Sequence, residues 1–334
     1  MMRVLVVGAG LAGCTVACEL AAAGVQVVLV ETGDEIGGKV LSYGCKGTDT
    51  CNNCGLCLAS GLWQKVEQCN IEIYCSTRLV DIQRENEIYS ATLKNSGGLI
   101  QLDGFAWVVV ATGFEPSASE GGYAELAYGS DGIITGSELE AIFRSRADTG
   151  LFDIPPKGVA FLQCYGSRDC QQHAQYCSRV CCGYATRAAK VIKHFYPDCR
   201  VVFFYMEMQM VAPGDYYQSL VDAGIEFVKC KPVKIAGRGQ DDSAGVIYDD
   251  PVLGQRVRVS FDWIVLSEGI RPSAQSRQLA EICGLGQDAS GFLRDAFYPN
   301  VVPIGCATGP KKIEETYTEA VALAKDILVE EALI

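Results

Sequence analysis

The sequence predicts an α/β protein with two doubly wound, Rossmann-like domains. A strand, a glycine loop, a helix and a second strand follow one another over residues 3–31. A second alternation of strand-sized apolar runs and helical patterns occupies residues 158–223, and a strand followed by a long helix closes the chain over residues 301–334. Because strands that alternate with helices form parallel sheets covered by helices, these observations predict the fold class.

The composition is that of a globular chain with an acidic charge balance. Its 334 residues are 49% hydrophobic and 20% charged, which excludes intrinsic disorder. The 28 Lys and Arg residues against 40 Asp and Glu residues give a net charge of −12, which disfavours binding to nucleic-acid phosphates or an anionic membrane. No apolar run approaches the roughly 20 residues that span a bilayer, and the N-terminal run is unlike a secretory signal. We therefore expect a cytoplasmic protein with no membrane span, whose partners are proteins or small molecules and not nucleic acid.

The segment over residues 3–31 is a complete dinucleotide-binding unit. Gly8 permits the tight turn, Gly10 lets the backbone approach a pyrophosphate at the helix N-terminus, and Gly13 lets helix and strand pack closely. Glu31 ends the second strand, where it is placed to accept the adenosine ribose hydroxyls, and its charge argues against a ribose 2′-phosphate. The residues expected to bind the cofactor in this unit are Gly8, Gly10, Ala12, Gly13 and Glu31.

Three further segments favour FAD over NAD as that cofactor. Residues 37–39 (Gly-Gly-Lys) and the strand 107–113 ending in Ala-Thr-Gly resemble the flavoprotein disulfide reductase superfamily. Residues 301–314 resemble its closing flavin motif, in which a strand reaches the ribityl chain and a helix N-terminus points at the isoalloxazine, where backbone N–H groups stabilise negative charge. Cys306 stands where the usual member has Asp. The FAD-binding residues expected in these segments are Gly38, Lys39, Ala111, Thr112, Gly113, Gly305, Cys306 and Ile313.

The order of these segments predicts a discontinuous FAD-binding domain, residues 1–115 and 272–334, interrupted by a second domain at residues 116–271. In pyridine-nucleotide-dependent relatives, the first strand of the second domain leads into another glycine-rich loop. Here residues 164–170 read Cys-Tyr-Gly-Ser-Arg-Asp-Cys instead. We therefore expect a nucleotide-domain-like region that has lost its nicotinamide site and carries an iron–sulfur cluster.

Cysteine is abundant, with 17 residues, and intracellular cysteines at this density indicate metal or redox chemistry. The main group has the spacing C-x12-C-x3-C-C, in which a strand end and a helix start supply thiols to suit an anionic cluster. Zinc sites normally use two separated C-x2-C pairs, so a [4Fe–4S] cluster fits better; reduced structural cysteines and a redox disulfide are the alternatives. The predicted cluster ligands are Cys164, Cys177, Cys181 and Cys182. Isolated cysteines in apolar patterns are expected to pack as small hydrophobic residues, namely Cys14, Cys18, Cys199, Cys230 and Cys283.

A second group has the spacing C-x5-C-x2-C-x2-C, which resembles half of a ferredoxin motif. It follows Gly37-Gly38, where glutathione-reductase-like enzymes carry a redox disulfide. Three interpretations remain open: a second iron–sulfur cluster, a redox-active thiol pair, and unliganded or partner-facing thiols. The members of this group are Cys45, Cys51, Cys54 and Cys57.

The main cysteine group also carries a resemblance to a known family. Residues 164–169 and 176–186 resemble the signature C-x-G-S-R-D…Y-C-S-x-V-C-C-x-Y-A-T of the HdrA subunit of heterodisulfide reductase and its HdrA-like relatives. The similarity extends along the chain, including residues 134–140 and 305–311. It implies a thioredoxin-reductase-like, FAD-binding fold in which the four signature cysteines ligate an unusual [4Fe–4S] cluster near the flavin. Length and signature together are most similar to the short HdrA-like subunit of bacterial sulfur-oxidising Hdr-like complexes.

The resemblance implies an electron-transfer oxidoreductase subunit, in which a flavin exchanges two electrons and a cluster passes them singly to a partner. The implied partners are Hdr B-like and C-like subunits, a lipoate-bearing protein that carries the sulfur, and a second copy in a homodimer. The alternatives are a self-contained NAD(P)H-dependent disulfide reductase that uses Cys54 and Cys57, and an assembly scaffold with a structural flavin. No side chain is predicted to act as a catalytic acid, base or nucleophile.

Overall fold

The computed structural model describes residues 2–117, 129–146, 150–170, 174–209, 215–238 and 243–333. The chain forms two compact units, which we call the first and second units. The first unit comprises Met1–Leu41, Gly55–Glu115 and Arg271–Ile334, and the second comprises Ser42–Cys54 and Pro116–Ile270. Residues 42–54 therefore belong to the second unit, although they precede much of the first in sequence.

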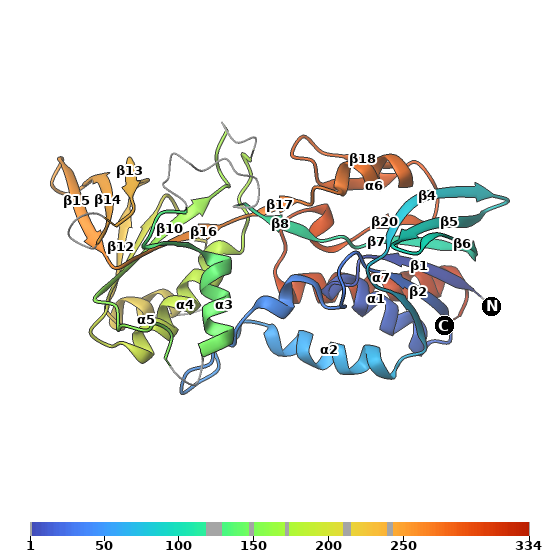
Figure 1. The fold of residues 1–334 in the computed structure, drawn as a ribbon, viewed down its shortest axis with the longest axis horizontal. Helices are drawn as coiled ribbons and strands as arrows, with labels where there is room; N and C mark the ends of the chain where they lie inside the picture. The colour runs from blue at the N-terminus through green and yellow to red at the C-terminus, as the bar shows by residue number, and fades with distance from the viewer. Residues whose placement is uncertain are drawn as a thin grey trace. The chain divides into compact units, whose positions relative to one another are not determined.

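The first unit is built on a five-stranded parallel sheet in the order β20-β7-β1-β2-β3 (Figure 1). Its central strand β1 follows directly from the N-terminus, and α1 and α7 pack against each other beside the sheet. The parallel strands and these helices are β1 (Arg3–Val7), α1 (Leu11–Ala22), β2 (Gln26–Val30), β3 (Ile71–Tyr74), β7 (Trp107–Val110), β20 (Val301–Pro303) and α7 (Ile313–Glu330).

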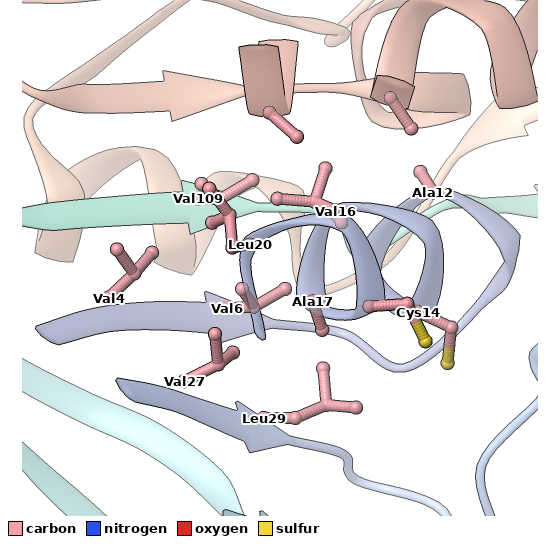
Figure 2. Close-up of a cluster of buried hydrophobic side chains, with 14 of the residues drawn as sticks. Val4, Val6, Ala12, Cys14, Val16, Ala17, Leu20, Val27, Leu29 and Val109 are labelled. Carbon is pink, nitrogen blue, oxygen red and sulfur yellow. The ribbon is translucent and has the colours of Figure 1, made fainter. Parts of the chain in front are cut away.

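Alternate side chains of β1 serve two different hydrophobic clusters, because successive strand residues point to opposite faces of the sheet. Val4 and Val6 pack with α1 and α7, and Figure 2 shows both among the side chains around Val16 of α1. Leu5 and Val7 pack on the other face with the sheet β4–β6 and with α6. Burying each such side chain stabilises the fold by about 1.5–3 kcal/mol.

Further elements complete the first unit. They are the short helix η1 (Gly38–Ser42), α2 (Leu56–Gln68), the antiparallel strands β4 (Arg78–Glu85), β5 (Ile88–Asn95) and β6 (Gly98–Phe105), α6 (Ser276–Cys283), β18 (Leu285–Gln287), β19 (Leu293–Ala296) and the short helix η4 (Gly305–Thr308). Two short paired strands, β8 (Phe114–Pro116) and β17 (Ile270–Pro272), carry the chain across the unit boundaries.

The second unit has its own five-stranded parallel sheet, in the order β12-β11-β10-β16-β9. Helices cover one face, and a three-stranded antiparallel sheet packs on the other. Its elements are β9 (Ile133–Thr135), α3 (Gly136–Arg146), β10 (Gly158–Tyr165), α4 (Cys181–Phe195), β11 (Arg200–Tyr205), α5 (Tyr216–Asp222), β12 (Ile225–Lys229), β13 (Lys234–Ala236), β14 (Ala244–Asp249), β15 (Arg256–Phe261) and β16 (Trp263–Glu268). The predicted α/β fold with two parallel, Rossmann-like sheets is confirmed. None of the helices within the described ranges has the length and apolar character needed to cross a bilayer.

Replacing Gly13 with alanine tests the tightest helix–loop approach in the first unit. A Cβ at Gly13 would lie 1.9 Å from the carbonyl oxygen of Gly8, so the backbone must shift. We expect Gly13→Ala to lower the free energy of unfolding by at least about 2 kcal/mol, measured by denaturant titration.

Gly61→Ala is the matched control, since Gly61 lies in α2 with no atom within 4 Å of an added Cβ. There alanine should raise the free energy of unfolding by roughly 0.5–1 kcal/mol. Equal stability of the Gly13→Ala variant and the native chain would contradict this account of the loop.

Candidate cofactor and metal sites

The glycine loop joins the end of β1 to the start of α1 and leaves the helix N-terminus open. Gly8 has φ +103°, and a Cβ there would lie 2.5 Å from the carbonyl oxygen of Ala111 at the end of β7. Gly10 is the N-cap of α1, has no side-chain cap, and would place a Cβ in open space. An uncapped helix N-terminus with free backbone approach suits a pyrophosphate.

Glu31 joins the glycine loop to the turn that follows β2. Its Oε2 accepts a hydrogen bond from the amide of Ala9 at 2.8 Å, and its Oε1 accepts one from the amide of Gly33 at 2.7 Å. The carboxylate therefore fixes the loop to the end of β2. The Thr32 hydroxyl also donates to Oε1, at 3.2 Å. An ionised carboxylate has about four lone-pair positions, so one remains for a ribose hydroxyl, and a second becomes available if the Thr32 hydroxyl turns away.

Two more predicted segments meet at the N-terminus of α1. Gly38 has φ +59°, and its Cβ would lie 3.1 Å from the Cα of Gly10. Gly305 has φ +68°, and its Cβ would lie 2.9 Å from the Cβ of Ala12. Lys39 is exposed, with its ammonium 5.7 Å from the centre of the Phe114 ring. Residues far apart in sequence thus surround one helix end.

The end of β7 offers the clearest polar group for a ligand. Thr112 Oγ1 is buried and has no hydrogen-bond partner among the residues that the structure describes. Ala111 is buried before it, and Gly113 follows with φ +71° and open space at its Cβ position. Because buried hydroxyls rarely stay unpaired, this atom fits a bound cofactor.

The closing segment is tied together by its own side chains. The Cys306 thiol donates to the carbonyl of Lys311 at 3.5 Å, and burial raises the pKa of Cys306, so it stays a neutral thiol. Glu319 accepts from the amide of Gly305 at 3.1 Å and from the Lys311 ammonium at 2.6 Å. Ile313 begins α7 and is half-buried. The sequence analysis did not predict a role for Glu319, because no motif or spacing along α7 indicates that it bonds to Gly305 and Lys311.

In the second unit, three of the four signature thiols come together. Cys181 and Cys182 begin α4, whose N-cap Val180 provides no side-chain cap, and Cys164 lies near the end of β10. The Cys181 thiol forms side-chain hydrogen bonds with Cys164 and Cys182. As acceptors of these bonds, Cys164 has a lowered pKa and Cys182 has a pKa lowered to about 7. As the donor, Cys181 has a pKa raised well above its ordinary value, and burial adds to that rise. Arg168 also favours the anionic forms of Cys164 and Cys182.

Cys177 lies apart from this hydrogen-bonded set. It is half-buried, and its sulfur accepts a hydrogen bond from the amide of Arg179 at 3.3 Å. Across the described part of the chain, no group of three or more Cys, His, Asp or Glu side chains has an arrangement that could hold a metal ion. Cys164, Cys181 and Cys182 supply the kind of donor that an iron–sulfur cluster uses. The predicted four-cysteine ligand set is not preformed among the described side chains.

Polar side chains that sequence reasoning missed hold the chain between the end of β16 and the start of β17. Ser178 Oγ accepts from the amide of Ile270 at 2.9 Å. The Tyr176 and Tyr184 hydroxyls donate to the carbonyls of Ile270 and Glu268, at 2.8 Å and 3.0 Å. Ser178 and both tyrosines fall inside the cysteine signature, which was the signal that could have identified them.

The second cysteine group is divided by the unit boundary. Cys45, Cys51 and Cys54 belong to the second unit, whereas Cys57 lies in the first turn of α2 in the first unit. The sulfurs of Cys45 and Cys51 are exposed and accept hydrogen bonds from the amides of nearby residues, Gly47 at 3.3 Å and Asn53 at 3.4 Å. These bonds hold each sulfur to its own stretch of backbone.

A buried ion pair holds the start of this cysteine segment. The Lys46 ammonium pairs with Glu140 of α3, and the side chains are 4% and 9% exposed, so the charges have little contact with water. Gly44 completes the arrangement, since its carbonyl accepts from Lys46 at 2.7 Å and its amide donates to Glu140 at 3.2 Å. Burial raises the pKa of Glu140, an effect that Lys46 opposes.

Glu140→Gln should destabilise the second unit strongly, because it leaves the Lys46 charge buried without its partner. The expected loss is about 3–5 kcal/mol in the free energy of unfolding, measured by denaturant titration. Glu226→Gln is the control, since Glu226 forms an exposed pair with Arg200 and should cost less than about 1 kcal/mol. Equal losses in the free energy of unfolding of the two variants would show that burying the Lys46–Glu140 pair does not increase its contribution to stability.

Comparison with known proteins identifies what the chain is similar to. Residues 6–65 match the family model of the NAD(P)-binding Rossmann-like domain. The chain is 34% identical over 236 residues to the A subunit of the H(2):CoB-CoM heterodisulfide,ferredoxin reductase of Methanothermobacter thermautotrophicus, covering 64% of this chain and 35% of that protein. It is 30% identical over 271 residues to a protein of Archaeoglobus profundus that is itself like the A subunit of heterodisulfide reductase, covering 70% of this chain and 38% of that protein. The chain thus spans little more than a third of the length of these relatives.

Solved structures of thioredoxin reductases share the fold. The thioredoxin reductase of T. acidophilum aligns with a TM-score of 0.67 at 17% sequence identity, over 99% of this chain and 100% of that one. The enzyme of Lactococcus lactis aligns with a TM-score of 0.63 at 17% identity, also over 99% and 100%. The expected thioredoxin-reductase-like fold is therefore confirmed.

Proposed function

We propose that the chain is an FAD-containing, iron–sulfur oxidoreductase subunit of the HdrA-like family that transfers electrons, as its similarity to the proteins of Methanothermobacter and Archaeoglobus over 64% and 70% of the chain supports. One observation carries the proposal. The Cys181 thiol hydrogen-bonds to both Cys164 and Cys182, where a nucleotide-binding second domain would have its glycine loop and helix N-terminus. This part of the chain has a thiolate site in place of a dinucleotide site.

The first unit supplies the flavin site in this proposal. The residues of this site fall within the predicted FAD-binding domain, 1–115 and 272–334, without residues 42–54. The amide at Gly10 and the uncapped end of α1 would bind the pyrophosphate, and Glu31 would accept the ribose hydroxyls. Thr112 would pair its buried hydroxyl with the cofactor, and the N-terminus of α7 at Ile313 would favour negative charge on it. Gly38 and Gly305 would border the same site, as their close approaches to Gly10 and Ala12 support. Lys39 would follow Gly38 there, beside the Phe114 ring.

The second unit supplies the cluster ligands, within residues 116–271. Ligation requires thiolates, so Cys181 must release the proton that it shares with its neighbours, and Cys177 must turn from the Arg179 amide toward them. The positive end of α4 and Arg168 favour the resulting negative charge. When bound, FAD supplies two-electron chemistry and a [4Fe–4S] cluster supplies single-electron steps.

The proposed complex and sulfur substrate rest on the resemblance of the cysteine signature to HdrA-like subunits. We propose that the chain acts in a cytoplasmic Hdr-like complex with B-like and C-like subunits, as a homodimer, and oxidises sulfur delivered on a lipoate-bearing protein. The similar proteins of Methanothermobacter and Archaeoglobus bear the names of heterodisulfide reductase subunits, which supports the assignment to a complex. Cys45, Cys51, Cys54 and Cys57 would then serve as a second cluster site or as redox thiols.

The test of the proposed function is metal and flavin analysis of a single-cysteine variant. Cys181→Ala removes the thiol that contacts two others, so we expect loss of cluster iron, sulfide and the broad visible absorption with unchanged flavin content. The measurement is iron, sulfide and flavin quantitation after anaerobic purification.

Cys199→Ala is the matched control, because Cys199 is buried in a hydrophobic cluster of the same unit and its thiol donates to the backbone carbonyl of Arg200, not to another cysteine. That variant should retain cluster and flavin alike. Full iron content in Cys181→Ala, or the absence of flavin from the native chain, would overturn the proposal.

Nicotinamide nucleotides should reduce the flavin negligibly, whereas a low-potential one-electron donor should reduce it. After Gln163, Cys164 and the buried side chain of Tyr165 occupy the place of a close-approach glycine loop. Anaerobic stopped-flow mixing with NADH and NADPH, followed at the flavin absorption band, makes the measurement. Rapid bleaching by either nucleotide would instead support a self-contained NAD(P)H-dependent disulfide reductase.

A further inference from the structure

The segment that carries three cysteines of the second group, residues 42–54, is packed onto two helices of the second unit. Gly44 makes the closest approach, because a Cβ there would lie 2.6 Å from the amide nitrogen of Arg144 and from the Cβ of Phe143, both on α3. The Lys46 ammonium lies 5.4 Å from the centre of the Phe143 ring as well as pairing with Glu140. The entry to the segment is therefore fixed to α3 by a close backbone approach and a buried charge.

The far end of the segment is fixed to α4. Arg187 Nε donates a hydrogen bond to the backbone carbonyl of Asn52 at 2.8 Å, and the Asn52 side-chain amide donates to the carbonyl of Lys46 at 2.7 Å. The second bond closes the segment into a loop. The first attaches that loop, between Cys51 and Cys54, to the side of α4.

The same helix carries the thiols of the main group. Cys181 and Cys182 form the first turn of α4, and Arg187 follows five residues after Cys182. At 1.5 Å per residue, Arg187 lies about 8–9 Å along the helix from those cysteines. A single half-buried side chain thus joins the backbone of one cysteine group to the helix that carries the other.

We propose that Arg187 is a positioning residue, which holds the loop carrying Cys51 and Cys54 at a fixed place beside the helix of Cys181 and Cys182. The loop thiols are thereby held at fixed positions and are not mobile surface thiols. The use of this site for a metal cluster or for electron exchange rests on the proposed function. The positioning itself rests only on the contacts of Arg187, Asn52 and Lys46.

The experiment is peptide-resolved alkylation of the full chain as purified. Arg187→Met keeps the aliphatic bulk and removes the guanidinium, so the alkylation rates of Cys51 and Cys54 should rise about fivefold or more. These rates are compared with the alkylation rate of Cys170, an exposed cysteine of the same unit outside the segment. Arg187→Lys keeps a charged donor and should restore most of the protection.

Arg200→Met is the matched control, since Arg200 forms an exposed pair with Glu226 on neighbouring strands. It should leave the rates at Cys51 and Cys54 unchanged. The proposal is overturned by unchanged rates in Arg187→Met, by an equal rise at Cys170, or by no recovery in Arg187→Lys. Iron and flavin are quantified in the same samples, and the absence of either contradicts the proposed function. The alkylation rates of Cys51 and Cys54 relative to Cys170 still test the positioning by Arg187.

Discussion

The first unit depends on the close approach of α1 to the glycine loop that precedes it. A side chain at Gly13 would overlap the Gly8 carbonyl, so only glycine lets the helix start where it does. That start fixes where Gly38 crosses Gly10 and where Gly305 meets Ala12. Three segments distant in sequence therefore surround one uncapped helix end, where a dinucleotide could bind without displacing a side chain.

The second unit uses the same strand-to-helix arrangement with different chemistry. Cys164 has φ +63°, a left-handed conformation that costs a residue other than glycine about 1–3 kcal/mol. The β10–β16 pairing also shifts register between Leu162 and Tyr165. The backbone thus turns as a glycine loop does, but it retains a thiol at the turn. That thiol hydrogen-bonds with Cys181 at the start of α4.

Environment divides the cysteines into two chemical classes. Burial raises the pKa of Cys283 to about 12 and that of Cys199 to about 11, so these side chains remain neutral and pack as small apolar groups, as predicted for isolated cysteines. Cys14 and Cys18 are likewise buried, whereas Cys230 is only partly so. Cys182 is equally buried, yet a hydrogen bond from Cys181 lowers its pKa to about 7. Hydrogen-bond donors, and not burial alone, distinguish thiols suited to ligation.

The sequence by itself predicted the two parallel sheets and the glycine loop, because strand, loop and helix patterns follow one another over short stretches of chain. It grouped four signature thiols, of which the structure joins three by hydrogen bonds and leaves Cys177 bonded to the amide of Arg179. Glu31 was identified at its strand end, but only the structure showed that its oxygens bind the amides of Ala9 and Gly33. The tertiary structure also decided that residues 42–54 join the second unit, through partners 94 and 135 residues away. Contacts between residues so distant leave no local periodicity, since their energy comes from burial and hydrogen bonding that exist only after the chain has folded.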